Sequence, residues 1–226
     1  MKWHVLLFSH SLRIYNVSMS KLFRYVALGD STAVGVGATQ GGGYPEYLFQ
    51  HLRRHWGANG PRVGFLNLGV SGATAADVLD RQVARAVRSS PQLVTLGIGT
   101  NDLWRMGPVS AFENAFRQTI MMLEQTEAQV VISNVGDLSL APAAQRAQAF
   151  LPVNADALSR RVDQINAVIL EAATRPRFTV VDVCSFGREV LTAHPEYFSS
   201  DGFHPSAEGY AQWAELLWPK VQRLLG

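Results

Sequence analysis

Cysteine is almost absent from this chain of 226 residues, in which Cys184 is the only one. A single cysteine excludes an internal disulfide framework and any zinc site built from several thiolates. Cys184 directly follows the apolar run 178–183. We therefore expect a buried and unreactive thiol.

An excess of charge of either sign is lacking as well, because the formal net charge is only +2. Proteins that bind nucleic acids or acidic membranes usually carry a clustered basic excess, so the composition favours neither class of partner. Apolar residues make up 47% of the chain, which is enough for a full core and too much for a disordered chain.

The N-terminal region has no hydrophobic run long enough to span a bilayer. Lys2 precedes the apolar segment 3–8, but this segment is short and no small-residue cleavage site follows it. We expect residues 1–18 to be a weakly ordered extension and residues 19–226, which begin at Met19, to form a single domain. We expect a cytoplasmic protein without stable membrane insertion, although the apolar segment leaves export open. The sequence also leaves the oligomeric state open.

Apolar runs alternate with segments of helical periodicity along the whole chain. The expected strands are 23–28, 63–68, 93–98, 130–135 and 178–183. Expected helix starts are Pro45, Thr74, the capping box at Ser110 to Glu113, Asn154 and Ser206. Pro219 is expected to kink or end the last helix. This βαβ order predicts a three-layer α/β/α sandwich around a five-stranded parallel sheet.

One connection is unusually long and shows no clear pattern. It runs from Gly136 to Pro152, just after the fourth expected strand. Long loops at this edge of an α/β sheet often bind ligands. Together with Trp104 and Met106, this loop is a candidate for shaping a substrate pocket, although core or rim packing explains the same residues equally well.

Four polar segments follow the expected strands or precede the last helix. They are Gly29-Asp-Ser31, Gly69-Val-Ser-Gly72, Gly99-Thr-Asn-Asp102 and Asp201-Gly-Phe-His204. Serine is a weak nucleophile that needs a base such as histidine, and a carboxylate fixes the tautomer of that histidine. The amides of Ser31 and Gly72, with the side chain of Asn101, can hold an oxyanion. Asp30 and Asp102 are expected to accept hydrogen bonds from loop amides nearby.

These four segments resemble the blocks of the GDSL hydrolases, also called SGNH hydrolases, in the same order. The resemblance covers roughly Tyr25 to the C-terminus, and Thr32 stands where the family motif has leucine, which bears on substrate preference. It implies Ser31 as nucleophile, His204 as base, Asp201 as its orienting carboxylate, and an oxyanion hole formed by Ser31, Gly72 and Asn101. It also implies an esterase that acts through an acyl-enzyme intermediate on a small-molecule ester and needs no cofactor and no metal. The resemblance leaves short-acyl, lipid and acetylated-sugar esters open as substrates.

Each residue also has an interpretation without catalysis. Ser31 and Asp201 occur in turn-forming sequences, Gly72 fits a turn with positive φ, and Asn101 can satisfy loop backbone. An acyltransferase that uses the same residues, or an inactive carbohydrate- or lipid-binding module on this fold, remains an alternative to the esterase. His194 is expected to be structural or to lie at a rim.

Two other motifs are set aside. His51 and His55 have the i, i+4 spacing of metal ligands, but without the zinc-protease pattern a solvated pair is expected. The glycine-rich run 35–43 does not match a nucleotide-binding loop, because Gln40 occupies the third glycine position of the dinucleotide fingerprint.

Overall fold

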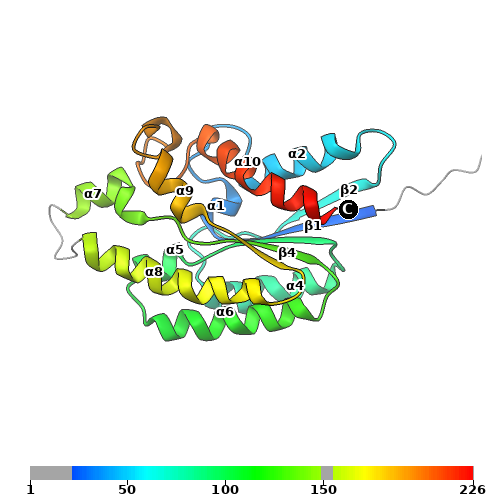
Figure 1. The fold of residues 1–226 in the computed structure, drawn as a ribbon, viewed down its shortest axis with the longest axis horizontal. Coiled ribbons are helices and arrows are strands. Elements are labelled where there is room, and N and C mark those ends of the chain that lie inside the picture. Colours follow the sequence, from blue (N-terminus) through cyan, green and yellow to red (C-terminus); the bar gives the residue numbers. More distant parts are fainter. Residues whose placement is uncertain (1–21, 149–154, 226) are drawn as a thin grey trace, which may run out of the picture.

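The computed structural model describes residues 22–148 and 155–225 and contains one parallel sheet (Figure 1). Its five strands lie in the order β2-β1-β3-β4-β5, which confirms the predicted five-stranded parallel sheet. The strands are β1 (Leu22–Gly29), β2 (Arg62–Asn67), β3 (Leu93–Gly97), β4 (Gln129–Ser133) and β5 (Phe178–Val181). All four pairings are parallel, so the carboxyl ends of the strands share one edge.

Helices cover both faces of this sheet and complete the predicted three layers. Helices α2 (Tyr44–Trp56) and α10 (Ala207–Leu224) pack together on one face. Helices α4 (Val83–Arg88), α6 (Val109–Glu124) and α8 (Ala155–Glu171) lie on the other face (Figure 1). Shorter helical segments connect these layers: α1 (Ser31–Val34), α3 (Ala75–Asp77), the π-helix η1 (Val78–Gln82), α5 (Thr100–Trp104), η2 (Leu138–Leu140), α7 (Pro142–Gln148), η3 (Ala172–Thr174), α9 (Val183–Val190) and η4 (Pro195–Tyr197).

Strand β1 is central and shows how the sequence builds two cores. Successive side chains of a strand point to opposite faces. Tyr25 and Ala27 therefore join the core beneath α2 and α10, whereas Val26 and Leu28 join the core beneath the other helices. All four side chains are buried. A run with no polar alternation is the pattern expected for a strand buried on both faces.

Two predictions about helices are wrong: the capping box as the start of α6, and Pro219 as the end of the last helix. Helix α6 begins at Val109 with Pro108 as its N-cap, so Ser110 lies inside the first turn instead of capping the helix. The Pro108 carbonyl accepts the Ala111 amide, and this bond starts the helix earlier than the capping box predicts. Helix α10 continues past Pro219 to Leu224, because the buried side chains of Leu217 and Val221 hold it against the sheet on both sides of the proline.

The connection after β4 also differs from the prediction of a patternless loop. It contains the 3-10 helix η2 and helix α7, and the Asp137 side chain caps η2 by accepting from the Ser139 amide. The predictions for residues 1–18 and for Asn154 as a helix cap lie outside the described residues. No helix in the described part of the chain is long and apolar enough to cross a membrane.

Candidate active site

The predicted site residues gather at the carboxyl edge of the sheet. Ser31 begins α1 directly after β1, and Gly72 lies in the loop after β2. Asn101 lies in the first turn of α5, after β3, and residues 201–204 precede α10. The fold brings these four segments together because parallel strands place their carboxyl ends side by side.

Ser31, His204 and Asp201 form a continuous hydrogen-bonded chain. His204 Nε2 lies 3.1 Å from Ser31 Oγ, and His204 Nδ1 lies 2.7 Å from Asp201 Oδ2. Since the carboxylate accepts the Nδ1 proton, Nε2 is left to accept the proton of the serine hydroxyl. The turn at Asp201 thus brings its carboxylate to His204 Nδ1, as the predicted role of Asp201 requires.

Asp201 is held in place by its own turn. Its Oδ1 accepts from Ser199 Oγ at 2.8 Å and from the amides of Phe203 and His204 at 2.7 and 2.9 Å. Burial acts to raise the pKa of Asp201, but the hydrogen bonds from the His204 ring, the two amides and Ser199 hold it well below its usual range. The aspartate is therefore ionised and fixed in orientation, as a partner for an imidazolium must be.

The predicted oxyanion hole consists of three N–H donors: the amides of Ser31 and Gly72 and the side-chain amide of Asn101. Within the described residues, the amides of Ser31 and Gly72 donate to no protein acceptor. Asn101 Nδ2 donates to the Ala73 carbonyl at 2.9 Å, and its second contact is to Asp30 Oδ2 at 3.5 Å. The second contact is long, so one amide hydrogen is only weakly engaged. Gly72 has φ +79°, a conformation that glycine adopts without strain.

Asp30 is a second carboxylate beside the nucleophile and is 1% exposed. Its Oδ1 accepts from the Thr32 amide at 2.9 Å and from the Thr32 hydroxyl at 2.8 Å. Burial raises the pKa of Asp30 to about 6, against the effect of these hydrogen bonds. Asp102 accepts from the Ala75 amide at 3.1 Å, so both aspartates bond loop amides as predicted.

Gln82 holds the end of β1 in place, and no pattern in the sequence predicted this role. This side chain is 2% exposed and lies in η1. Its Oε1 accepts from the Gly29 amide at 2.9 Å, and its Nε2 donates to the Gly29 carbonyl at 2.8 Å. Gly29 has φ +148°, and a Cβ there would lie 2.4 Å from the Gly97 carbonyl oxygen. Gln82 therefore fixes the backbone two residues before Ser31.

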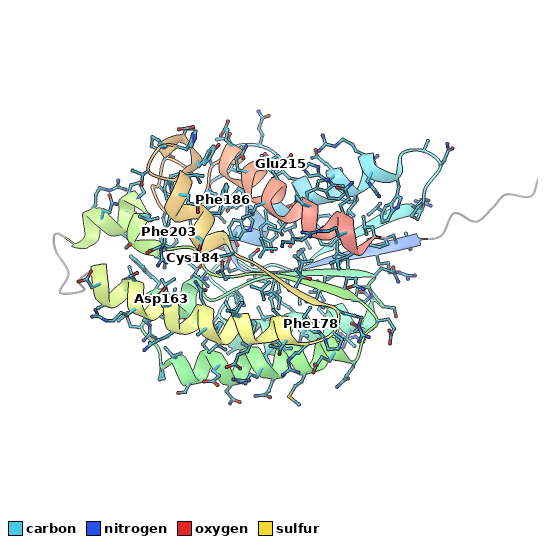
Figure 2. The ribbon with its side chains drawn as sticks, in the orientation of Figure 1. Asp163, Phe178, Cys184, Phe186, Phe203 and Glu215 are labelled. Atoms are coloured by element: carbon cyan, nitrogen blue, oxygen red, sulfur yellow. The ribbon has the colours of Figure 1, made fainter. Side chains whose placement is uncertain are left out.

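A pocket of about 130 Å³ opens beside Ser31 and His204 and is called the side pocket below. Most of its wall is apolar, including Leu138, Phe186, Leu191, Phe203 and Trp213. Figure 2 shows Phe186 and Phe203 at the end of the molecule where α7 and α9 lie, away from Phe178. Gly136, Leu138 and Ala141 come from the long connection after β4, as the ligand-binding hypothesis for that loop requires.

Trp104 and Met106 do not line the side pocket, and their side chains are about half exposed. The residues that form it instead, on α9 and α10, were not identified from the sequence. Their helical spacing indicates only buried faces, and the pocket exists because α9, α10 and the connection after β4 converge near Ser31.

Two other histidines in the described part of the chain, His51 and His194, have partners outside the hydrogen-bonded chain of Ser31, His204 and Asp201. His51 is not the solvated side chain that was expected, because its Nε2 lies 3.1 Å from Glu215 Oε1 and its ring stacks on Trp218. His194 pairs with Glu196 at 2.8 Å and stacks on Tyr197. The described residues contain no cluster of three or more side chains suited to a metal. Cys184 is buried as predicted, and burial raises the pKa of its thiol to about 11.

Comparison with known proteins identifies relatives of this fold and sequence. An acetylxylan esterase from Geobacillus stearothermophilus is 27% identical over 178 residues, which cover 75% of this chain and 76% of the relative. The crystal structure of an acetylxylan esterase from the same organism superposes with a TM-score of 0.70 at 19% identity, covering 90% of this chain and 95% of that chain. A lipase from a goat rumen metagenome superposes with a TM-score of 0.68 at 19% identity, covering 87% and 96% of the two chains.

A match to a family model identifies the family of the chain. The model of the GDSL-like lipase/acylhydrolase family matches residues 27–212, which include all the predicted site residues. The predicted resemblance is therefore confirmed: the chain belongs to the GDSL-like lipase/acylhydrolase family and is a carboxylic ester hydrolase.

Proposed function

We propose that the chain hydrolyses carboxylic esters through an acyl-enzyme intermediate on Ser31. The observation that supports this most directly is the hydrogen-bonded chain from Asp201 through His204 to Ser31 Oγ, with contacts of 2.7 and 3.1 Å. At 3.1 Å, His204 Nε2 is close enough to Ser31 Oγ to take its proton.

In the first step, Ser31 Oγ attacks the ester carbonyl carbon and its proton passes to His204 Nε2. The carbonyl π electrons move to oxygen, and the amides of Ser31 and Gly72 with Asn101 Nδ2 stabilise the resulting anion. As the anion collapses, the bond to the leaving alcohol breaks, and His204 protonates that oxygen. Asp201 stays ionised throughout and stabilises the imidazolium.

In the second step, water replaces the alcohol. His204 takes a proton from the water as its oxygen bonds to the acyl carbon, and the oxyanion forms again in the same place. When the bond from this carbon to Ser31 Oγ breaks, His204 returns the proton to the serine. The carboxylic acid leaves and the enzyme is regenerated, with no cofactor required.

A fluorophosphonate probe tests this proposal. The wild-type chain should be labelled with one equivalent at Ser31, and Ser31→Ala should abolish both labelling and ester hydrolysis. Ser71→Ala is the matched control, because Ser71 lies in the neighbouring Gly72 segment but makes no contact in the proposed chemistry. Labelling that maps to Ser71 or Ser206, or hydrolysis retained in Ser31→Ala, would contradict the assignment of the nucleophile.

Product analysis separates hydrolysis from acyl transfer. With an ester and water alone, free carboxylic acid should form in proportion to the alcohol released. If turnover depended on an added alcohol and produced a new ester, the acyltransferase alternative would be correct.

A further inference from the structure

We propose that the side pocket receives the acyl chain of the substrate and selects acyl groups of about four to eight carbons over acetyl. This inference rests on the proposed function of Ser31 and specifies the class of ester that it hydrolyses. Ser31, His204 and Thr100, the neighbour of Asn101, form part of the pocket wall. A group attached to the carbonyl carbon at Ser31 therefore enters this pocket directly.

The lining of the pocket favours an uncharged chain. Among the described residues that line the pocket, Asp137 is the only acidic one, and Arg188 Nε donates to Asp137 Oδ2 at 2.8 Å. The other oxygen of Asp137 accepts from Ser139. Trp213 donates its Nε1 hydrogen to Ser133 Oγ at 3.0 Å, which leaves the apolar surface of the ring to line the pocket. Because Asp137 and Trp213 already have partners, the occupant gains little by offering charge or hydrogen bonds to these two side chains.

The size of the pocket sets the length of the chain. A cavity of roughly 150 Å³ lined by apolar side chains holds benzene, which has six carbons. At about 130 Å³, the side pocket matches roughly five or six carbons beyond the carbonyl. The single methyl of an acetyl group would leave most of this apolar surface without a partner.

The order of chemical steps assigns the pocket to the acyl group. The alcohol must leave before water attacks, whereas the acyl group stays on Ser31 through both steps. Beyond the segments that carry Ser31, Thr100 and His204, the side pocket is walled by the connection after β4, α9, η4 and the start of α10. Val70 and Trp104, on the segments that carry Gly72 and Asn101, are 49% and 48% exposed. The alcohol can therefore leave over this open rim.

Two series of esters provide the test. In the first, p-nitrophenyl esters carry acetyl, butanoyl, hexanoyl, octanoyl or dodecanoyl groups; in the second, acetate is esterified to ethanol, butanol or hexanol. Burying a methylene is worth about fourfold in affinity, or ~0.8 kcal/mol. We therefore expect kcat/KM to rise at least about tenfold from acetyl to hexanoyl, and to fall at dodecanoyl. The acetates should show little dependence on the length of the alcohol.

Two substitutions in the pocket should shift the optimum in opposite directions. A Cβ at Gly187 would meet only the Leu191 side chain, at 3.2 Å, so Gly187→Ala adds a methyl at the pocket wall and also favours the helix. This variant should move the optimum to shorter chains. Leu191→Ala enlarges the pocket and should move the optimum to longer chains. The matched controls lie outside the pocket: Gly107→Ala, where a Cβ meets nothing within 4 Å, and Leu170→Ala, which is 61% exposed.

The outcomes separate this inference from the proposed function. Fastest hydrolysis of acetyl esters, a preference that follows alcohol length, or pocket variants that leave the chain-length profile unchanged would overturn the inference while leaving Ser31 as the nucleophile. Failure to hydrolyse any ester, together with no probe labelling, would instead overturn the proposed function.

Discussion

Two aspartates near Ser31 show how the local environment shifts the pKa of the same side chain in opposite directions. Asp201 is partly exposed and receives several hydrogen bonds, which keep its pKa below the usual range despite the opposing effect of burial. Asp30 is 1% exposed, and burial raises its pKa to about 6. The first aspartate is suited to permanent charge beside His204, whereas the second becomes costly to the fold when it ionises.

Asp30→Asn should therefore stabilise the protein more at pH 7 than at pH 4. Between these values the folded wild-type protein binds more protons at Asp30 than the unfolded chain does, so its free energy of unfolding decreases as pH rises. Ionisation of the buried Asp30 lowers the free energy of unfolding by up to about 3 kcal/mol, and this loss is complete above pH ~6. The asparagine cannot ionise, and its Oδ1 can still accept from Thr32. Urea unfolding of both proteins between pH 4 and 7 measures the difference.

The comparison variant Asp201→Asn should have the opposite effect on the free energy of unfolding. The low folded pKa of Asp201 stabilises the protein above the unfolded value near 4, and this contribution is lost as pH falls toward the folded pKa. The asparagine should therefore destabilise at pH 7 and matter less in acid. A stability difference for Asp30→Asn that does not change with pH would show that Asp30 has the same pKa in the folded and unfolded protein.

Asn101→Ala should lower kcat by about 10²–10³ and change KM much less, because an oxyanion donor acts mainly in the transition state. Steady-state kinetics on one ester gives both constants. Because the substitution also removes the bond to the Ala73 carbonyl, a thermal melt should confirm that the variant is folded. If KM alone increased, Asn101 would be a contact to the bound substrate instead.

At the level of the elements, local patterns predict strands better than they predict connections. The five predicted apolar runs each match a strand within two residues at either end. The π-helix η1 has no comparable signal, and it carries Gln82 to a partner 53 residues earlier in the chain. The start of α6 also differs, because the observed N-cap, Pro108, lies two residues before Ser110, where the capping box begins.

The same limit applies to the candidate site. The four polar segments could be predicted because each lies next to a strand end or a helix start, and their placement follows from the parallel sheet. The side pocket could not be predicted, because Phe186 and Trp213 lie on helices that meet only in three dimensions. The part of the site that carries out chemistry is therefore visible in the sequence, whereas the part that selects the substrate depends on packing.

Ser206 is the N-cap of α10 and gives a prediction at this scale. Its Oγ accepts from the Gly209 amide at 3.2 Å and donates to the Glu196 carbonyl at 2.7 Å. Ser206→Ala should lower the free energy of unfolding by about 1 kcal/mol, as loss of an N-cap usually does. Denaturant unfolding measures this loss. Ser206→Thr keeps the hydroxyl and should retain most of the stability; an equal loss in both variants would show that the cap is not the cause.

At the level of the whole molecule, the first long helix and the last helix pack on the same face of the sheet. Helix α2 contacts α10, and His51 on α2 pairs with Glu215 on α10. All predicted site residues lie between Ser31 and His204. The described part of the chain therefore contains the complete candidate site.

Deletion of residues 1–18, so that the chain begins at Met19, should leave kcat/KM and the thermal midpoint nearly unchanged. These residues contain none of the four polar segments and precede β1. The full-length chain, assayed beside the truncated one, is the control. A large decrease in the thermal midpoint would show that the apolar segment 3–8 docks on the domain, and cleavage near residue 20 during export would identify a signal peptide.

The contact between Ser31 and His204 joins the first strand region to the entry of the last helix, 173 residues apart. During synthesis, the nucleophile leaves the ribosome long before its base. A nascent chain can therefore bury much of its sheet and still be unable to hydrolyse an ester. The same applies to a protein released early by a premature stop codon before His204. If Ser31 and His204 act as proposed, ester turnover by this protein reports that translation has passed His204.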